Sequence, residues 1–458
     1  MKKLSLINFK ILFLIIFFFN EISFSQYVEK ISLEESLKLG LTNSKELKIS
    51  SSKVNYSEAK VSEITSLFLP SLSFDASYAR LSDVPPFEVS VPLFPTPIKI
   101  SDPVLNNYNL RLSVKQPLFT GLRLLSTKKA AELNYTAAEY NDKEQANNIA
   151  LRIHTTFWSY YKAEQIEQII KEQINALREN LDNTRNFMEN GLATRNDVLK
   201  LEVQYSNANL KLVDAKNNVN LARVKFNQLI GIDWRSPSNL IVGQLEPEGT
   251  KIYSELWDDL YVQAHNNSNI IWSMDAMVKS ADENMSAAKS SWFPQIYLFG
   301  DYYYSNPNQR IQPLENKFYD TWDVGVALNW EIWNWGLTSS RVTQSEELKF
   351  QSEMALEQYR DKLREDVYAA YFNYKTALEK INVSKLSVEQ AEENYRITLE
   401  KYNQQLATSS DLIDAETSLS EAKINYTNTL VDYQIAKVQL DKLLGNISIK
   451  ESGVRSQK

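Results

Sequence analysis

The stretch Gly191–Leu199, GLATRNDVL, recurs 214 positions later (405 − 191) as Gln405–Ile413, QLATSSDLI. Both copies share the pattern Leu-Ala-Thr-x-x-Asp. In each copy the threonine and the aspartate have the spacing of a capping box, in which the threonine caps a helix and an acid three residues later closes the cap. Each stretch therefore predicts a tight turn where one helix ends and the next begins.

The repeat extends far beyond these two turns. With the same offset, Gly231 aligns with Gly445. Upstream the offset becomes 224, because Pro70 aligns with Pro294 (294 − 70). The difference of ten residues (224 − 214) must lie between Pro70 and about Pro117. The chain is thus predicted to be a tandem duplication with one loop of different length.

After each turn, apolar or small residues recur in alternating steps of three and four, which is the heptad pattern of a coiled coil. In the first half they are Val198, Leu201, Tyr205, Ala208, Leu212, Ala215, Val219, Ala222, Phe226 and Leu229. In the second half they are Leu412, Ala415, Leu419, Ala422, Tyr426, Thr429, Tyr433, Ala436, Leu440 and Leu443. The helix before the first turn carries a matching row from Ile170 to Met188. Antiparallel helical hairpins are predicted, with the Leu-Ala-Thr turns at their tips.

Four other segments alternate apolar and polar residues, as strands do. They are Ser71–Ala79, Tyr108–Lys115 and residues 296–302 and 322–330. Segments of about ten residues with one apolar and one polar face suit a lipid-facing barrel with a wet lumen, although a half-buried soluble sheet alternates in the same way. Arg111, Lys115 and Asp323 on the polar face favour the barrel, and tryptophans between Trp330 and Trp335 resemble an interfacial girdle.

The amino terminus indicates that the chain is exported from the cytoplasm, which is consistent with a membrane barrel. Lys2 and Lys3 precede the short apolar run Ile11–Phe19, and small residues follow at Ser23–Ser25. This order is typical of a secretory signal cleaved after Ser25. The run is shorter than the ~20 apolar residues of a membrane-spanning helix, so we expect residues 1–25 to be a signal peptide.

Composition excludes several classes of function. The chain has no cysteine, so it has no thiolate nucleophile or thiolate metal site. His154 and His265 match no metal-ligand spacing, and a net charge of −7 gives no basic surface for nucleic acid. Because no nucleophile–base pair or phosphate-binding glycine loop is present, we expect no enzyme activity, no cofactor and no metal site.

Four strands cannot close a barrel, and an open sheet edge cannot face lipid, so copies of the chain must share one barrel. Residues 122–190 would form ~100 Å of helix, but the return helix to Gly231 only ~57 Å. We therefore expect two shorter helices, stacked end to end in a column, to match the length of each long helix. Residues 251–291 would extend the column that ends at Gly231, and residues 31–66 would extend the column that ends at Gly445.

Three motifs in this order, spread along the mature chain, resemble the TolC-like outer membrane efflux proteins. They are QPLFTGLR (Gln116–Arg123), its counterpart WEIWNWGL (Trp330–Leu337) and TSSDLIDAE (Thr408–Glu416). The resemblance implies a mainly α fold with a membrane β-barrel. Each chain of a homotrimer contributes four strands to a shared twelve-stranded barrel, and the helices form a long coiled-coil tube in the periplasm.

The resemblance further implies an outer-membrane exit duct of a tripartite efflux or type I secretion system. A periplasmic adaptor protein would dock it to an inner-membrane transporter. The alternative is a trimeric outer-membrane stalk or adhesin. A stalk would place its strands at one terminus, whereas here they fall once in each half.

The expected organisation follows the repeat. It comprises a signal peptide (1–25), helices (26–69), a first barrel hairpin (70–119), a first helical hairpin (120–231), an equatorial link (232–254), helices (255–292), a second barrel hairpin (293–334), a second helical hairpin (335–445) and a tail (446–458).

The resemblance also assigns residues at the tips. Asp411 and Asp414 match acids that ring the periplasmic aperture; capping accounts for Asp411, but Asp414 aligns with Lys200 and is not explained by the repeat. Asp197 and Tyr402 match a latch between the hairpins. The adaptor-docking tips would be Gly191, Leu192, Ala193, Thr194, Leu406, Ala407 and Thr408. Ala407, opposite Asn196, stands where the family has a second latch arginine.

Overall fold

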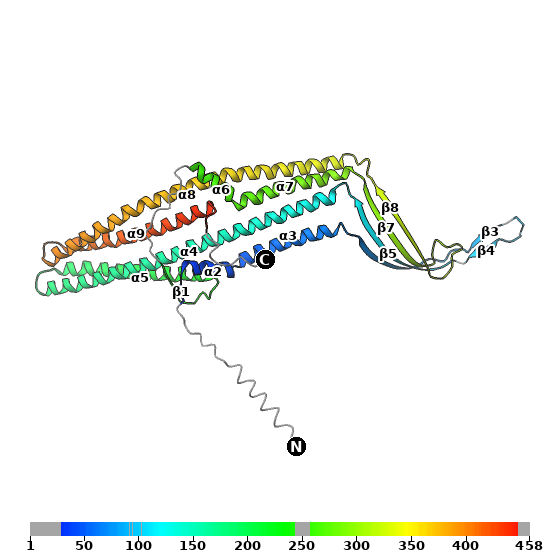
Figure 1. Cartoon of the computed structure of the whole chain (residues 1–458). Coiled ribbons are helices and arrows are strands. Elements are labelled where there is room, and N and C mark those ends of the chain that lie inside the picture. The colour runs from blue at the N-terminus through cyan, green and yellow to red at the C-terminus, as the bar shows by residue number, and fades with distance from the viewer. Residues whose placement is uncertain (1–28, 91, 94, 102, 243–256, 448–458) are drawn as a thin grey trace, which may run out of the picture.

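The computed structural model describes residues 29–90, 92–93, 95–101, 103–242 and 257–447. The expected signal peptide and most of the expected tail lie outside these residues. The described chain is elongated, with long helices at one end and a strongly bent sheet at the other (Figure 1).

Two helical hairpins make up most of the length. The first pairs α4 (Arg123–Glu189) with α5 (Arg195–Ile230), and the second pairs α8 (Leu337–Asn403) with α9 (Ser409–Leu443). α4 and α8 have 67 residues each, which corresponds to roughly 100 Å of helix. The turns between the paired helices fall at the two Leu-Ala-Thr stretches, as predicted.

The heptad rows form the core of these hairpins. In the first hairpin, Ile170, Leu177 and Leu181 of α4 pack in one buried cluster with Val198 and Leu201 of α5. In the second, Leu440 and Tyr433 lie in a cluster with residues of α8. Small residues at alternate positions of the rows, such as Ala208 and Ala215, are also buried. The coiled-coil prediction is therefore confirmed.

Short helices continue the two return helices toward the sheet. They are α2 (Leu33–Asn43) and α3 (Lys45–Ser66) in the first half, and α6 (Trp257–Asn267) and α7 (Asn269–Lys289) in the second; α7 ends in the 3-10 turn η1 (Ser290–Trp292). Asn43 Nδ2 donates to the carbonyl of Ile230 at 3.0 Å, so α3 continues the column of α5. Asn267 Nδ2 donates to the carbonyl of Leu444 at 2.8 Å, so α7 continues the column of α9.

The expected pairing of these columns was wrong, because each return helix meets short helices of its own half. The reason is the packing at the helix ends. Gly231 and Gly445 have φ of 78° and 73°, which exposes the last carbonyls of α5 and α9 to the two asparagines. A Cβ on either glycine would lie within 2.4 Å or 2.6 Å of the Cβ of Asn43 or Asn267.

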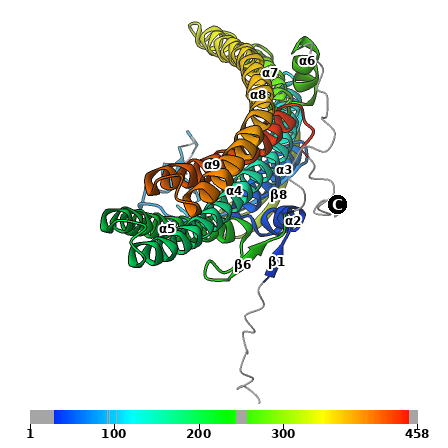
Figure 2. The ribbon, with the colours of Figure 1, turned by 90° about the vertical axis from the view of Figure 1, so that its left-hand side faces the viewer.

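The long helices lie side by side in a curved layer rather than a closed bundle (Figure 2). Toward the tips the neighbours run α5, α4, α9 and α8, and toward the sheet they run α3, α4, α7 and α8. α4 therefore contacts α9 of the second hairpin as well as its own partner α5. Near the tips α5 and α9 also contact each other, and α5 and α8 form the two edges of the layer.

The strands form one antiparallel sheet in the order β2 (Ser71–Arg80), β5 (Asn106–Phe119), β7 (Gln295–Asn306) and β8 (Tyr319–Asn329). The pairing of β5 with β7 joins the two halves of the repeat. Within the described ranges no strand pairs with the outer edge of β2 or of β8.

Two small strand pairs were not predicted. β1 (Glu29–Ile31) runs parallel to β6 (Ser238–Leu240), and β3 (Phe87–Val89) pairs with β4 (Ile98–Ser101) in a ribbon that extends beyond the sheet (Figure 1). Strands of three or four residues are too short for a period-two pattern to identify them.

Candidate functional site: the helical tips and the sheet

Both tip turns have the same construction. The N–H groups of Leu192 and Leu406 each donate to the carbonyl five residues earlier, at 2.8 Å. The residues before them, Gly191 and Gln405, adopt left-handed φ values of 73° and 63°. This is the Schellman helix ending, in which glycine is the usual left-handed residue. The second tip places a glutamine there, at a cost of about 1 kcal/mol relative to glycine.

A capping box follows each turn, as the sequence predicts. The N–H of Thr194 donates to Asp197 Oδ2 at 3.0 Å, and the N–H of Asp197 donates back to the Thr194 hydroxyl at 3.3 Å. At the second tip the same two bonds join Thr408 and Asp411, at 2.8 Å and 3.2 Å. The Thr408 hydroxyl also donates to Asp411 Oδ2 at 2.7 Å, and this bond, followed by the one from the Thr408 N–H, lowers the pKa of the Asp411 carboxyl. In each half one helix ends and the next begins within a few residues. This shared requirement explains why both halves keep the Leu-Ala-Thr-x-x-Asp pattern.

The leucines of the tips are exposed. The accessible fraction is 54% for Leu192 and 73% for Leu406, although a leucine in this position of a Schellman ending usually packs against its own helix. The other residues expected to dock the adaptor are exposed or half-buried: Gly191, Ala193, Thr194, Ala407 and Thr408. The structure thus leaves two apolar side chains free at the end of the helical layer.

The residues expected to latch the hairpins have separate partners. Tyr402 is buried, and its hydroxyl pairs with the Thr184 hydroxyl of α4 at 2.6 Å. Asp197 Oδ1 instead accepts from the Ser409 hydroxyl at 2.6 Å. Between these two described residues no hydrogen bond forms, because the tyrosine ring turns into the helix layer beside Phe187 at a centroid distance of 6.0 Å. The expected direct contact is therefore replaced by two contacts between the hairpins.

A further polar contact joins the two hairpins near the tips. Lys200 Nζ on α5 donates to the Ser410 hydroxyl on α9 at 2.9 Å. Lys200, Ser410, Asn196 and Asp414 line one groove of about 410 Å³ between the two helices. The sequence identified Lys200 only as the repeat counterpart of Asp414. Its role in joining the hairpins could not be inferred without knowing that α5 and α9 are neighbours.

A buried acid on α9 was also missed. Glu416 is 5% exposed, and Gln173 Nε2 of α4 donates to its Oε2 at 2.9 Å. Burial raises the pKa of Glu416 to about 7, against smaller opposing effects of this hydrogen bond and of Lys211. The carboxyl therefore titrates near neutral pH, at the interface between the two hairpins.

At the opposite end of the molecule, one face of the sheet is apolar and exposed across all four strands. Cross-strand register places Phe74, Leu112, Tyr302 and Trp322 in one row. Further exposed apolar residues on this face are Leu72, Val114, Leu298, Val324, Val326 and Leu328. An apolar face of this extent on a soluble chain marks an interaction surface or a contact with lipid.

Tryptophans gather where this face ends. Trp330, Trp333 and Trp335 are exposed between β8 and α8, and Trp330 Nε1 donates to the carbonyl of Trp292 at 3.1 Å. Indole rings with one apolar and one polar side favour the boundary between lipid and water. The girdle that the sequence predicts therefore has the required exposure.

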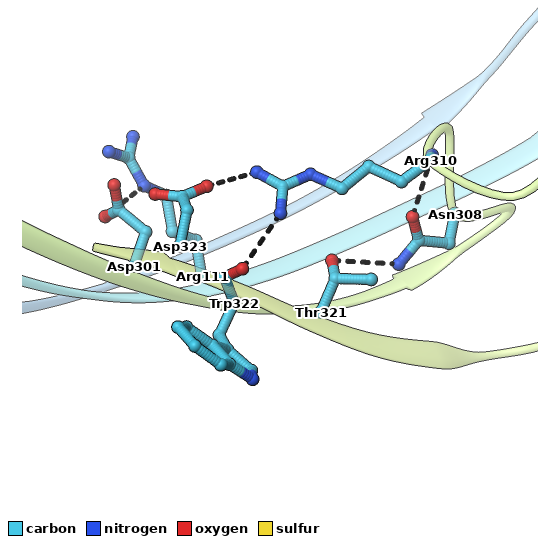
Figure 3. Close-up of polar contacts among 7 residues, drawn as sticks. All are labelled: Arg111, Asp301, Asn308, Arg310, Thr321, Trp322 and Asp323. Carbon is cyan, nitrogen blue, oxygen red and sulfur yellow. Dashed lines mark hydrogen bonds and ion pairs between the residues drawn. The ribbon is translucent and has the colours of Figure 1, made fainter. Parts of the chain in front are cut away.

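The other face of the sheet is polar and carries paired charges (Figure 3). Arg111 Nε donates to Asp301 Oδ1 at 2.9 Å, and Asp301 is buried. Arg310 pairs with Asp323, which lies opposite Asp301 on the neighbouring strand. The alternation predicted from the sequence is thus confirmed, with the charges on one side and the apolar residues on the other.

The described residues offer little for catalysis by a metal. In them no three acidic or histidine side chains are grouped to hold a metal ion. His154 lies in a cavity of about 430 Å³, and burial lowers its pKa to about 4.

No helix in the described part of the chain combines the length and the apolarity needed to cross a bilayer.

Comparisons with known proteins agree with this geometry. A family model described as outer membrane efflux protein matches residues 37–232 and 260–446. The outer membrane efflux protein BepC of Brucella suis biovar 1 is 21% identical over 346 residues, which cover 75% of this chain and 73% of BepC.

Solved structures share the fold at low identity. CusC superimposes with a TM-score of 0.77 at 16% identity, covering 90% of this chain and 92% of CusC. The Campylobacter jejuni CmeC outer membrane channel gives 0.76 at 16% identity, covering 90% and 85%. The family match favours an exit duct over the stalk or adhesin, and it locates the protein in the outer membrane with a periplasmic extension. Because the family model covers well over half of its residues, this chain belongs to the outer membrane efflux protein family.

Proposed function

We propose that three copies of this chain form the outer-membrane exit duct of a tripartite efflux or type I secretion system. The observation that carries the proposal is the four-stranded sheet with two free edges and an exposed apolar face. Because the strands alternate in direction, β8 of one copy and β2 of the next would meet antiparallel and continue the ladder. Three sheets would close in this way with the apolar faces toward lipid.

The helices support the same assembly. On α5, Leu199, Val203, Leu210, Val213 and Leu221 are exposed along one stripe. On α8, Val383, Leu386 and Ile397 are exposed at helical spacing. Since α5 and α8 are the edges of the curved layer, the two stripes would cover each other between neighbouring copies and close the layer into a tube.

The tips would bind the periplasmic adaptor of an inner-membrane transporter. The exposed Leu192 and Leu406 would supply apolar contacts, with Gly191, Ala193, Thr194, Ala407 and Thr408 around them. Three copies of a short turn with a protruding leucine present a repeated apolar surface, suited to an adaptor with a matching groove.

The same tips would control the inner aperture. Asp411 and Asp414 are exposed, so three copies of the pair would concentrate carboxylates at a narrow mouth and favour cations. The contacts of Tyr402 with Thr184 and of Asp197 with Ser409 would hold the two hairpins together in the closed form.

Electron microscopy of the protein purified in detergent tests the proposal. We expect a hollow trimer with a helical tube of roughly 100 Å. A solid trimeric stalk would instead favour an adhesin. A monodisperse monomer with native helicity in the absence of detergent would contradict the shared barrel.

A further inference from the structure

The two loops at the far end of the sheet have different conformations. In the first half, the described residues between β2 and β5 include the β3–β4 ribbon, which extends away from the sheet (Figure 1). Residues 307–318, between β7 and β8, turn back and contact the polar face (Figure 3). The sequence repeat alone does not predict this difference. The loop that turns back is held by contacts of its own side chains with the sheet.

Arg310 connects the returning loop to two strands. Its guanidinium group donates to the carboxylate of Asp323, and Nη1 donates to the carbonyl of Trp322 at 3.0 Å. The guanidinium carbon lies 5.4 Å from the ring centre of Tyr303 on β7, within the range of a cation–π contact. A charge-assisted bond, a carbonyl and an aromatic ring thus hold one side chain.

Other contacts fix both ends of the loop. Asn308 is buried, and its Nδ2 donates to the carbonyl of Tyr319 and to the hydroxyl of Thr321, each at 3.2 Å. Its Oδ1 accepts from the N–H of Arg310 at 3.0 Å. At the other end the ring of Phe318 stacks on Tyr304 at 5.0 Å. The loop is therefore folded by specific contacts and does not merely lie on the surface.

The loop lies over the outer end of the polar face. A cavity of about 500 Å³ separates them, lined from the sheet side by Ser77 of β2, Asn109 of β5, Tyr303 of β7 and Thr321 of β8. Asn308 and Arg310 line it from the loop. All four strands thus contribute residues to the cavity under the loop.

Two acids on the polar face at this end are paired with arginines, and a third, Asp75, lies opposite Arg111 in the strand register. Arg310 is paired with Asp323, and Arg111 is paired with Asp301. Both guanidinium groups lie over the ring of Tyr303, at 5.4 Å and 5.6 Å. The tips differ, because among the described tip residues the exposed acids Asp411 and Asp414 form no ion pair with an arginine. A loop whose charges are paired should select solutes by size more than by the sign of their charge.

We propose that residues 307–318 form an exit loop that narrows the outer end of the channel, and that the contact between Arg310 and Asp323 holds it over the polar face. The inference rests on the proposed function, in which the polar face lines the channel. Bulky hydrated solutes would be held back, whereas small ions of either sign would pass. Salt screens half-exposed ion pairs, so the exit should widen at high ionic strength.

Cysteine labelling on intact cells tests the exit loop. The chain has no cysteine of its own, so Asn109→Cys, under the loop, is the single reactive site. A polyethylene-glycol maleimide too large to cross the outer membrane reports access from outside. The reporter is compared in the otherwise unchanged chain, in Arg310→Gln, in Asp323→Asn and in the double variant. Lys317→Gln, which removes a charge of the same loop over the Tyr319 ring, is the matched control.

We expect labelling to accelerate about tenfold in either single variant, which is the scale of one charge-assisted contact. The double variant should be no faster than Arg310→Gln, because that substitution already removes the contact with Asp323, and Lys317→Gln should label at the unchanged rate. High salt should accelerate labelling only where the pair is intact. Equal labelling of all variants in a trimeric outer-membrane protein would overturn the exit loop alone. Absence of the trimer from the outer membrane would overturn the proposed function.

Discussion

Replacing Glu416 by glutamine should make the contact between the two hairpins independent of pH near neutrality. In the native chain, Glu416 is buried between α9 and α4 with Gln173 as its hydrogen-bond partner. Burial penalises the charged form and raises the pKa to about 7. Glutamine keeps the size and an oxygen acceptor for Gln173 but cannot ionise, so the penalty disappears.

The size of the effect follows from the pKa difference. The folded value of about 7 lies 2.5 units above the reference value of 4.5 (7 − 4.5). At ~1.4 kcal/mol per unit, the difference corresponds to about 3 kcal/mol. Because the folded pKa is raised, the full stability is present below pH 4.5 and is lost as the pH rises through about 7. Above this range the glutamine variant should be the more stable one by up to about 3 kcal/mol.

Hydrogen exchange followed by mass spectrometry measures this locally, since it reports the opening free energy of α9 peptides while the sheet stays folded. Exchange rates are corrected for the intrinsic effect of pH. The matched control is Glu202→Gln at the equivalent repeat position (416 − 202 = 214), where the carboxylate pairs with Arg185 at 2.9 Å and its pKa is lowered. That variant should not change the dependence of α9 between pH 5 and 8.

Two results would refute this reasoning. If the native chain and Glu416→Gln show the same pH dependence, burial does not hold the proton on Glu416. If Glu202→Gln removes the dependence as well, a general charge effect and not the buried position is responsible.

Three further predictions concern the tips. Leu406→Glu should leave the trimer intact and abolish export, because the exposed apolar contact for the adaptor is lost, whereas the neighbouring Gln404→Glu should export normally in the same cell assay; normal export by both would remove the docking role. Asp411→Asn combined with Asp414→Asn should reduce the cation preference and the block by multivalent cations in planar-bilayer recordings, and an unchanged preference would place the charged ring elsewhere. Tyr402→Phe removes a buried hydrogen bond worth about 1 kcal/mol, so it should raise the conductance with the selectivity kept; unchanged conductance would leave Tyr402 as a packing residue.

Local pattern was enough to predict the elements of this fold. Heptad steps identified the buried rows of α5 and α9, and alternation identified the two faces of β2, β5, β7 and β8. The capping boxes at Thr194 and Thr408 were also predicted, because a helix start depends on residues only three positions apart. These features share a physical origin in interactions along one segment or between adjacent segments.

Arrangement between the hairpins could not be predicted in the same way. The repeat makes Glu202 and Glu416 equivalent, yet the first is half-buried on an edge helix and the second is buried against α4. The columns were paired wrongly and Tyr402 was given the wrong partner for a similar reason. The curvature of the whole helical layer determines which helix of one half contacts the other half. The two repeats have similar local sequences, so local sequence does not predict these contacts.

The breaks in two of the four columns have a mechanical consequence. α4 and α8 are continuous, so twisting them at mid-height would break backbone hydrogen bonds within a helix. At the same height, the joints after α5 and α9 carry side-chain bonds, from Asn43 at 3.0 Å and from Asn267 at 2.8 Å. Torsional compliance is therefore concentrated at two matching points of the wall. A rotation of the tip-side segments would be taken up at these joints and by bending of the continuous α4 and α8.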